Sequence, residues 1–136
     1  MGEAWIIDAA RTPRAIGKQG KGALWEIHPQ KLLSTVLSAL VERNGLDTND
    51  IDDVVMSCSS QVKKQAQCIA RMAALDAGYS TRASGVTLDR FCGGGISAVN
   101  MGAASIMSGM EDLVVAGGVE MTVSYTHLRA HETVSD

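Results

Sequence analysis

The stretch that decides the fold is residues 84–109, SGVTLDRFCGGGISAVNMGAASIMSG. Its apolar residues Val86 and Leu88 predict a strand at residues 86–89. Residues 96–109 contain no charged side chain, and a segment that is apolar or small on every face is typical of a buried helix. A strand, one cysteine, three glycines and a buried helix are therefore expected to follow one another here.

Cys92 is the candidate catalytic residue of this stretch. It falls at the predicted helix N-terminus, where free N–H groups and the helix dipole favour an anion, and the thiolate is the nucleophilic form of cysteine. Most cysteines are simply small buried hydrophobes. However, an interior glycine costs a helix about 1 kcal/mol relative to alanine, so Gly93, Gly94 and Gly95 indicate that another group approaches the backbone closely. The lysine and glycine spacing of nucleotide-binding loops are absent, and the pattern favours a nucleophile.

Four ordered segments give the sequence its resemblance to the thiolases, enzymes that make and break carbon–carbon bonds in acyl-CoA thioesters. Residues 86–95 (VTLDRFCGGG) resemble the nucleophile segment of that family. Residues 7–13 (IDAARTP) resemble its opening strand and Arg-Thr-Pro turn, and residues 114–121 (VVAGGVEM) its Gly-Gly-x-Glu-x-Met segment. Residues 67–75 (QCIARMAAL) are a weaker match to its Arg-x-Ala-Ala helix. The resemblance covers about residues 4–122.

This resemblance implies an α/β fold, a thiolase-like N-terminal domain with a mostly parallel sheet and a buried nucleophile helix. It implies that Cys92 carries the acyl group as a thioester and that its backbone N–H contributes to an oxyanion hole. Gly93, Gly94 and Gly95 would let the substrate approach. The substrates would be acetyl-CoA and other acyl-CoA thioesters, with no metal or further cofactor. The full-length protein would be a homo-oligomer.

The same resemblance indicates that part of the machinery lies elsewhere. Thiolases are far longer, and their activating histidine and second, acid/base cysteine lie in the later half. His28 precedes a helix-opening proline and does not match that histidine motif. We therefore expect the chain to be an N-terminal fragment that is inactive alone. Two alternatives remain: a ketoacyl synthase of fatty-acid or polyketide assembly, and a non-catalytic thiolase-like subunit for assembly or lipid binding.

Strands and helices are predicted to alternate along the chain. The continuous apolar run at residues 4–9 predicts a buried strand, and the period of leucines and valines after Pro29 predicts a helix that ends at Asn44-Gly45. A strand is expected at residues 52–58, a helix at 64–77 and strands at 86–89 and 113–116. This order is typical of right-handed βαβ units and a parallel sheet, whose catalytic groups gather at the carboxyl ends of the strands.

The boundary of the domain is placed at residue 122. Residues 1–122 are expected to form a thiolase N-terminal domain. Residues 123–136 are polar, lack a clear period and do not resemble the family, so we expect a foreign tail, artefactual or disordered. His127 and His131 within it are spaced as two zinc ligands on a helix can be, but the absence of a third ligand disfavours a metal site.

Composition excludes several classes of function. A net charge of −3 and a pI near 5.5 give no reason to expect nucleic acid as a partner. No apolar run approaches the ~20 residues that a membrane span needs. The first residues lack a basic region followed by an apolar core, so no secretory signal is expected. Three cysteines without paired spacing indicate a reducing, cytoplasmic location. Cys58 is expected to pack in the core, Cys68 to lie on a helix surface or interface, and the basic loop 14–22 to be solvated.

Overall fold

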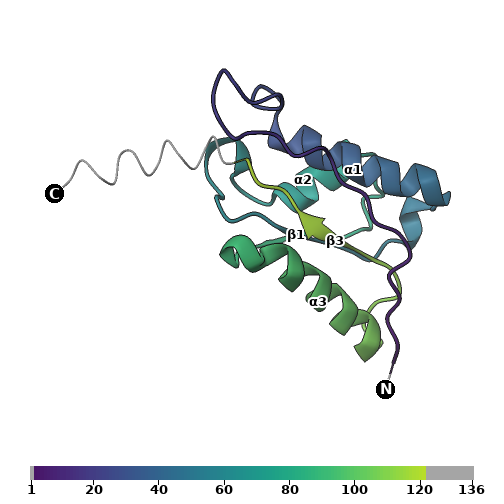
Figure 1. Ribbon diagram of the computed structural model, residues 1–136. Coiled ribbons are helices and arrows are strands. Elements are labelled where there is room, and N and C mark those ends of the chain that lie inside the picture. The colour runs from purple at the N-terminus through teal and green to yellow at the C-terminus, as the bar shows by residue number, and fades with distance from the viewer. Residues whose placement is uncertain (1, 122–136) are drawn as a thin grey trace.

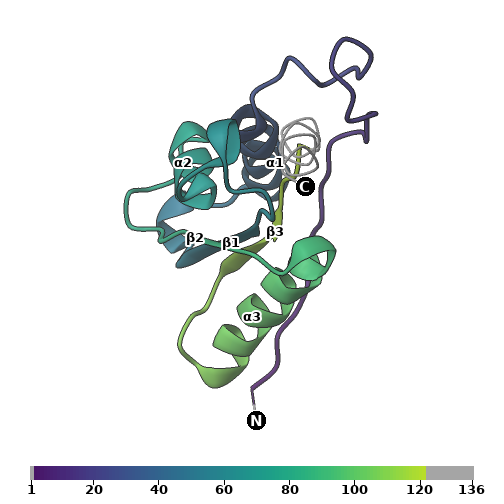
Figure 2. The same cartoon turned by 90° about the vertical axis from the view of Figure 1, so that its left-hand side faces the viewer.

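The computed structural model describes residues 2–121, and in it a sheet of three parallel strands lies between two layers of helices (Figure 1). Strand β1 (Asp53–Ser57) is central, with β2 (Val86–Leu88) on one side and β3 (Val114–Gly118) on the other. Helices α1 (Pro29–Asn44) and α2 (Ile69–Asp76) cover one face, and α3 (Gly94–Ser108) covers the opposite face (Figure 2). This arrangement confirms the expected α/β class and the parallel sheet.

The main core lies between the sheet and the pair α1 and α2. Alternate residues of a strand point to opposite faces, so Val54 and Met56 point toward these helices, and both are almost completely buried. They pack with Leu33 and Leu37 of α1 and with a run of alanines on α2. The small alanine side chains allow α2, a helix of eight residues, to pack closely against the sheet.

Helix α1 begins and ends where its sequence predicts. His28 is its N-cap, and Nδ1 of that side chain accepts a hydrogen bond from the N–H of Gln30 at 3.2 Å. Pro29 follows in the first turn, where a missing N–H costs nothing. Gly45 ends the helix with a φ of 58°, in the left-handed region that glycine adopts without steric cost.

The helix expected over residues 64–77 is shorter in the structure. A 3-10 turn (Lys63–Gln65) comes first, and α2 starts only at Ile69. Gln67 has a φ of 62°, which no α-helix accommodates, and the buried amide of Gln65 bonds away from the helix axis. The prediction was therefore wrong for residues 64–68, because tertiary hydrogen bonds outweigh the local helical preference.

The strand predicted at residues 4–9 is not present, and this prediction was wrong. Residues 2–17 form neither strand nor helix, and Trp5, Ile6 and Ile7 are 81%, 81% and 72% exposed. The segment runs extended past the sheet beside the C-terminal end of α1 (Figure 1). A strand needs a neighbour to pair its backbone groups, and no described residue supplies one.

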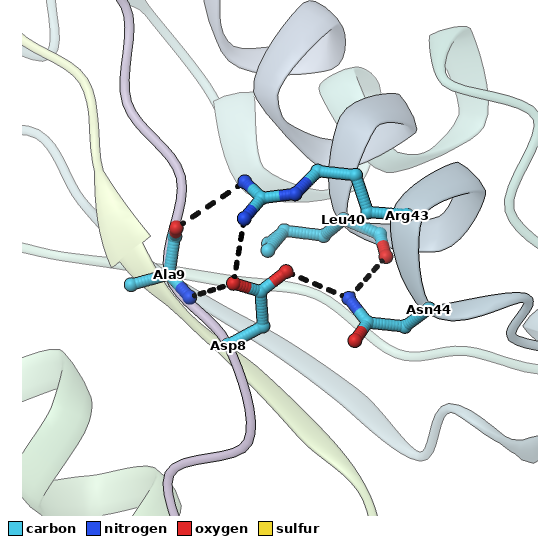
Figure 3. Close-up of polar contacts among 5 residues, drawn as sticks. All are labelled: Asp8, Ala9, Leu40, Arg43 and Asn44. Carbon is cyan, nitrogen blue, oxygen red and sulfur yellow. Dashed lines mark hydrogen bonds and ion pairs between the residues drawn. The ribbon is translucent and has the colours of Figure 1, made fainter.

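An acidic side chain attaches this segment to α1 (Figure 3). Asp8 Oδ1 accepts a hydrogen bond from Arg43 Nη2 at 3.0 Å, and Oδ2 accepts one from Asn44 Nδ2 at 2.8 Å. The bond from Asn44, followed by those from the Ala9 N–H and the charge of Arg43, lowers the pKa of Asp8. Polar contacts of Asp8 thus attach this part of the segment to the C-terminal end of α1.

Helix α3 is buried on one side only among the described residues. Ala98 is fully buried against the sheet, and Gly102 lies so close that a Cβ on it would be 3.0 Å from Val114 Cγ1. On the outer side, Ile96 is 72% and Met101 51% exposed. Among residues 2–121 the predicted burial of this helix is therefore confirmed on the side that faces the sheet. The apolar side chains on its outer side are exposed.

Candidate functional site

The carboxyl ends of the three strands meet at one edge of the sheet. Ser57 of β1 is in register with Leu88 of β2 and with Gly118 of β3. The segments that follow each strand, residues 58–68, 89–93 and 119–121, therefore gather at this edge. Cys92 lies in the middle one, as the sequence predicts for a catalytic group of a parallel sheet.

Cys92 lies in a short 3-10 turn (Phe91–Gly93) that leads directly into α3. Its side chain is exposed and free of any disulfide. Phe91 has a φ of 44°, an unusual value for a residue with a side chain, and its N–H donates to Asp89 Oδ1 at 2.8 Å. Backbone strain of this kind concentrates at functional sites. The turn presents the thiol to solvent at the start of the helix.

The three glycines after Cys92 differ in what surrounds them. A Cβ on Gly94 would be 1.7 Å from the hydroxyl oxygen of Ser57, so only glycine allows α3 to begin against β1. A Cβ on Gly95 would have open space, and one on Gly93 would meet only the Arg90 side chain at 3.9 Å. Helix–strand packing thus explains Gly94, whereas substrate approach stays a prediction for all three.

The other two cysteines lie in different surroundings. Cys58 is buried directly after β1, as expected, and burial together with the negative charges of Glu120 and Asp89 raises the pKa of its thiol to about 11. Cys68 is half-buried just before α2, and its Sγ donates to the Gly85 carbonyl at 3.3 Å. Cys92 is the one exposed thiol of residues 2–121.

Sequence reasoning missed a polar cluster beside the strand ends. Glu120 Oε2 accepts from the Ser59 N–H at 2.8 Å and from Ser59 Oγ at 2.6 Å, and its Oε1 accepts from Gln65 Nε2 at 3.1 Å. Gln65 is fully buried, and it also donates to the Ser60 carbonyl and accepts from the Met121 N–H. A glutamine within a stretch expected to be helical gives no sign of this role.

A separate hollow lies between the N-terminal segment, α1 and the residues after β3. Its volume is about 290 Å3, and Cys92 does not line it. Arg11 and Arg14 reach its wall, which is otherwise mainly apolar around Trp25 and Leu32. The basic residues of loop 14–22 are exposed, as the solvated interpretation predicted.

Other expected features can be placed as follows. His28 is the N-cap of α1, whereas Cys92 lies in the turn before α3. His127 and His131, together with the expected tail, lie outside the described residues. Within residues 2–121, no group of three or more His, Cys, Asp or Glu side chains is arranged to hold a metal ion. No helix in this part of the chain is long and apolar enough to cross a membrane.

Comparison with known proteins identifies the class. The sequence model of the thiolase N-terminal domain matches residues 4–135. The chain therefore belongs to the thiolase family, and the fold is that of the family's N-terminal domain.

Particular relatives agree with this assignment. A steroid 3-ketoacyl-CoA thiolase of Mycobacterium tuberculosis is 46% identical over 120 residues, and a 3-oxoadipyl-CoA/3-oxo-5,6-dehydrosuberyl-CoA thiolase of Escherichia coli is 43% identical over 121. Each alignment covers 88% of this chain and 29% of the relative. The crystal structure of the Bacillus anthracis acetyl-CoA acetyltransferase superposes with a TM-score of 0.66 at 36% identity, over 71% of this chain and 24% of that one. The chain thus spans less than a third of the length of these proteins.

Proposed function

We propose that the protein is part of an acyl-CoA C-acyltransferase that makes or cleaves 3-ketoacyl-CoA, with Cys92 as the nucleophile. The observation that carries this proposal is the position of Cys92, exposed at the start of α3 and at the carboxyl edge of the sheet, in a member of the thiolase family. The match to a thiolase domain favours this activity over a ketoacyl synthase.

The proposed cleavage proceeds in two half-reactions. The Cys92 thiolate attacks C3 of a 3-ketoacyl-CoA, and the C2–C3 bond then breaks, which leaves the acyl group on sulfur. The electron pair of that bond goes to C2, and its protonation releases acetyl-CoA. The thiol of free CoA next takes the acyl group and restores Cys92. The exchange needs no metal or redox cofactor.

The described residues supply the nucleophile but no imidazole beside it. His28 is the sole histidine of residues 2–121, and it caps α1. Protonation of C2 and activation of the CoA thiol need an acid and a base. We therefore propose that turnover depends on groups outside residues 2–121, and that these residues alone support acylation without efficient turnover.

Location and assembly can be proposed from the cysteines and from the outer side of α3. Free thiols at Cys58, Cys68 and Cys92 support a reducing compartment such as the cytoplasm. The open apolar side of α3, with Ile96 and Met101, supports burial of this helix in a larger assembly, in agreement with a homo-oligomer of the full-length protein.

The test is acetylation of the protein by acetyl-CoA, followed by mass spectrometry of its peptides. We expect one hydroxylamine-labile acetyl group on Cys92, absent in Cys92→Ala and retained in Cys58→Ala and Cys68→Ala. A chain extended with the second half of a thiolase relative should also cleave acetoacetyl-CoA, and Cys92→Ala should abolish that cleavage. Acetylation of Cys68 instead, or of no cysteine, would contradict the assignment.

A further inference from the structure

Glu120 is a carboxylate with all its hydrogen bonds directed to one loop. Its Oε2 accepts two bonds from Ser59, from the N–H at 2.8 Å and from Oγ at 2.6 Å. Its Oε1 accepts a bond from Gln65 Nε2 at 3.1 Å. No lysine or arginine of residues 2–121 forms an ion pair with it. The carboxylate therefore joins the segment after β3 to the loop after β1.

Gln65 closes this connection into a ring. Its side chain is fully buried, and Nε2 also donates to the Ser60 carbonyl at 2.9 Å. Its Oε1 accepts from the N–H of Met121, the neighbour of Glu120. Every polar atom of the amide thus bonds either to the loop after β1 or to the segment after β3. Such a satisfied network holds the two backbones in one arrangement.

The same contacts argue against a role for Glu120 as an acid or base. Burial raises the pKa of its carboxyl group, but the hydrogen bonds from Ser59 and Gln65 outweigh burial, and the pKa lies below its ordinary value. Both oxygens are occupied by donors. A carboxylate in this state neither accepts a proton readily nor has one to give.

The loop that Glu120 binds follows Ser57, and Ser57 contacts Gly94 at the start of α3. Ser57 is the last residue of β1, and its carbonyl accepts from the Val119 N–H at 3.0 Å, one residue before Glu120. The Ser57 side chain also fills the place of a Cβ at Gly94, which is two residues after Cys92. A Cβ on Gly118 would be 2.7 Å from the Ser57 carbonyl oxygen. A shift of Ser57 is therefore transmitted directly to the start of α3.

We propose that Glu120 is a positioning residue for Cys92. By bonding Ser59 and Gln65 it holds the end of β1 against the end of β3, and Ser57 in turn fixes the backbone of α3 at Gly94. This inference rests on the proposed acyl transfer through Cys92. Acyl transfer requires that donors at the start of α3 face the developing oxyanion, whereas simple alkylation of an exposed thiol has no such requirement.

The variant Glu120→Gln separates these two reactions. One oxygen becomes an NH2 group, which then faces a donor of either Ser59 or Gln65, so at least one bond of the ring is lost. We expect acetylation of Cys92 by acetyl-CoA to fall up to about 100-fold, the order of loss for a reacting group displaced by about 1 Å. Alkylation of Cys92 by iodoacetamide should keep its rate. The matched control is Glu42→Gln on the exposed side of α1, which should change neither rate.

A second, milder variant tests the same network if Glu120→Gln does not fold. Ser59→Ala removes the Oγ donor but keeps the backbone N–H on Glu120, so it should slow acetylation in the same direction by a smaller factor. Equal slowing of acetylation and alkylation, or no effect of either variant on acetylation, would overturn the positioning role. Absence of acetylation in the unmodified chain would instead refute the proposed function itself, and the inference with it.

Discussion

Two apolar stretches of this chain look alike in sequence and differ completely in the structure. Residues 54–56 (VVM) are at most 3% exposed in the centre of the sheet. Residues 5–7 (WII) are 72–81% exposed and form no strand. Both runs predict a buried strand from composition alone. The difference teaches that hydrophobicity selects candidates for burial, while strand formation depends on the neighbours that are available.

The neighbours of the two stretches explain the outcome. Strand β1 pairs with a strand on each side and is covered by helices on both faces. Residues 5–7 have no strand partner among residues 2–121, and the neighbouring Asp8 is hydrogen-bonded to Arg43 and Asn44 (Figure 3). Burial of an unpaired backbone would leave its N–H and C=O groups without hydrogen bonds. The segment therefore stays extended at the surface.

The largest effect is expected from truncating an isoleucine in each region. Ile51, just before β1, is 1% exposed, whereas Ile6 is 81% exposed. Ile51→Ala should lower the free energy of unfolding by about 2–5 kcal/mol, or prevent folding, because it leaves a cavity. Ile6→Ala should change it by less than about 0.5 kcal/mol. Urea denaturation measures both, and equal losses would mean that the N-terminal segment is packed like β1.

A smaller effect is expected at the glycines that face the end of β1. Gly94→Ala places a methyl group against the Ser57 hydroxyl and should destabilise the protein by about 1–3 kcal/mol. Gly95→Ala, in open space on the same helix, should stabilise it by about 0.5–1 kcal/mol. Thermal unfolding of the two variants tests this contrast. A stable Gly94→Ala protein would show that α3 does not rest on Ser57.

The smallest effect is expected from pH at the end of β1. The pKa of Cys58 is about 11 in the folded protein against an ordinary value of 9.0, so the unfolded chain loses this proton first as the pH rises. The contribution of the protonated Cys58 thiol to the free energy of unfolding is complete below pH 9 and declines as the pH rises toward 11. Tyr79, with a pKa of about 12 against 10.0, extends the decline.

Urea denaturation at several alkaline pH values measures this decline. In Cys58→Ala the fall in stability between about pH 9 and pH 10 should be reduced, while Tyr79 preserves the fall at higher pH. An unchanged pH profile in Cys58→Ala would indicate that Cys58 is not buried with its thiol protonated.

Sequence patterns were sufficient to predict helices and strands wherever their positions follow from local signals in the chain. Pro29 and Asn44-Gly45, the signals expected at helix ends, mark both ends of α1 correctly. The apolar runs of β1, β2 and β3 predict strands that the structure confirms within one or two residues. The motif around Cys92 also predicts its place at the carboxyl edge of the sheet, because that place follows from the order of strand, turn and helix.

What the sequence by itself determined is therefore the α/β class, the family, most element boundaries and the candidate nucleophile. Only the tertiary structure decided that residues 5–7 remain unpaired, that α2 begins late, and that Gln65 and Glu120 link the ends of β1 and β3. The physical reason is that strand pairing and hydrogen-bonded networks join residues far apart in the chain, 55 positions in the case of Gln65 and Glu120. Local propensity and periodicity carry no information about such partners.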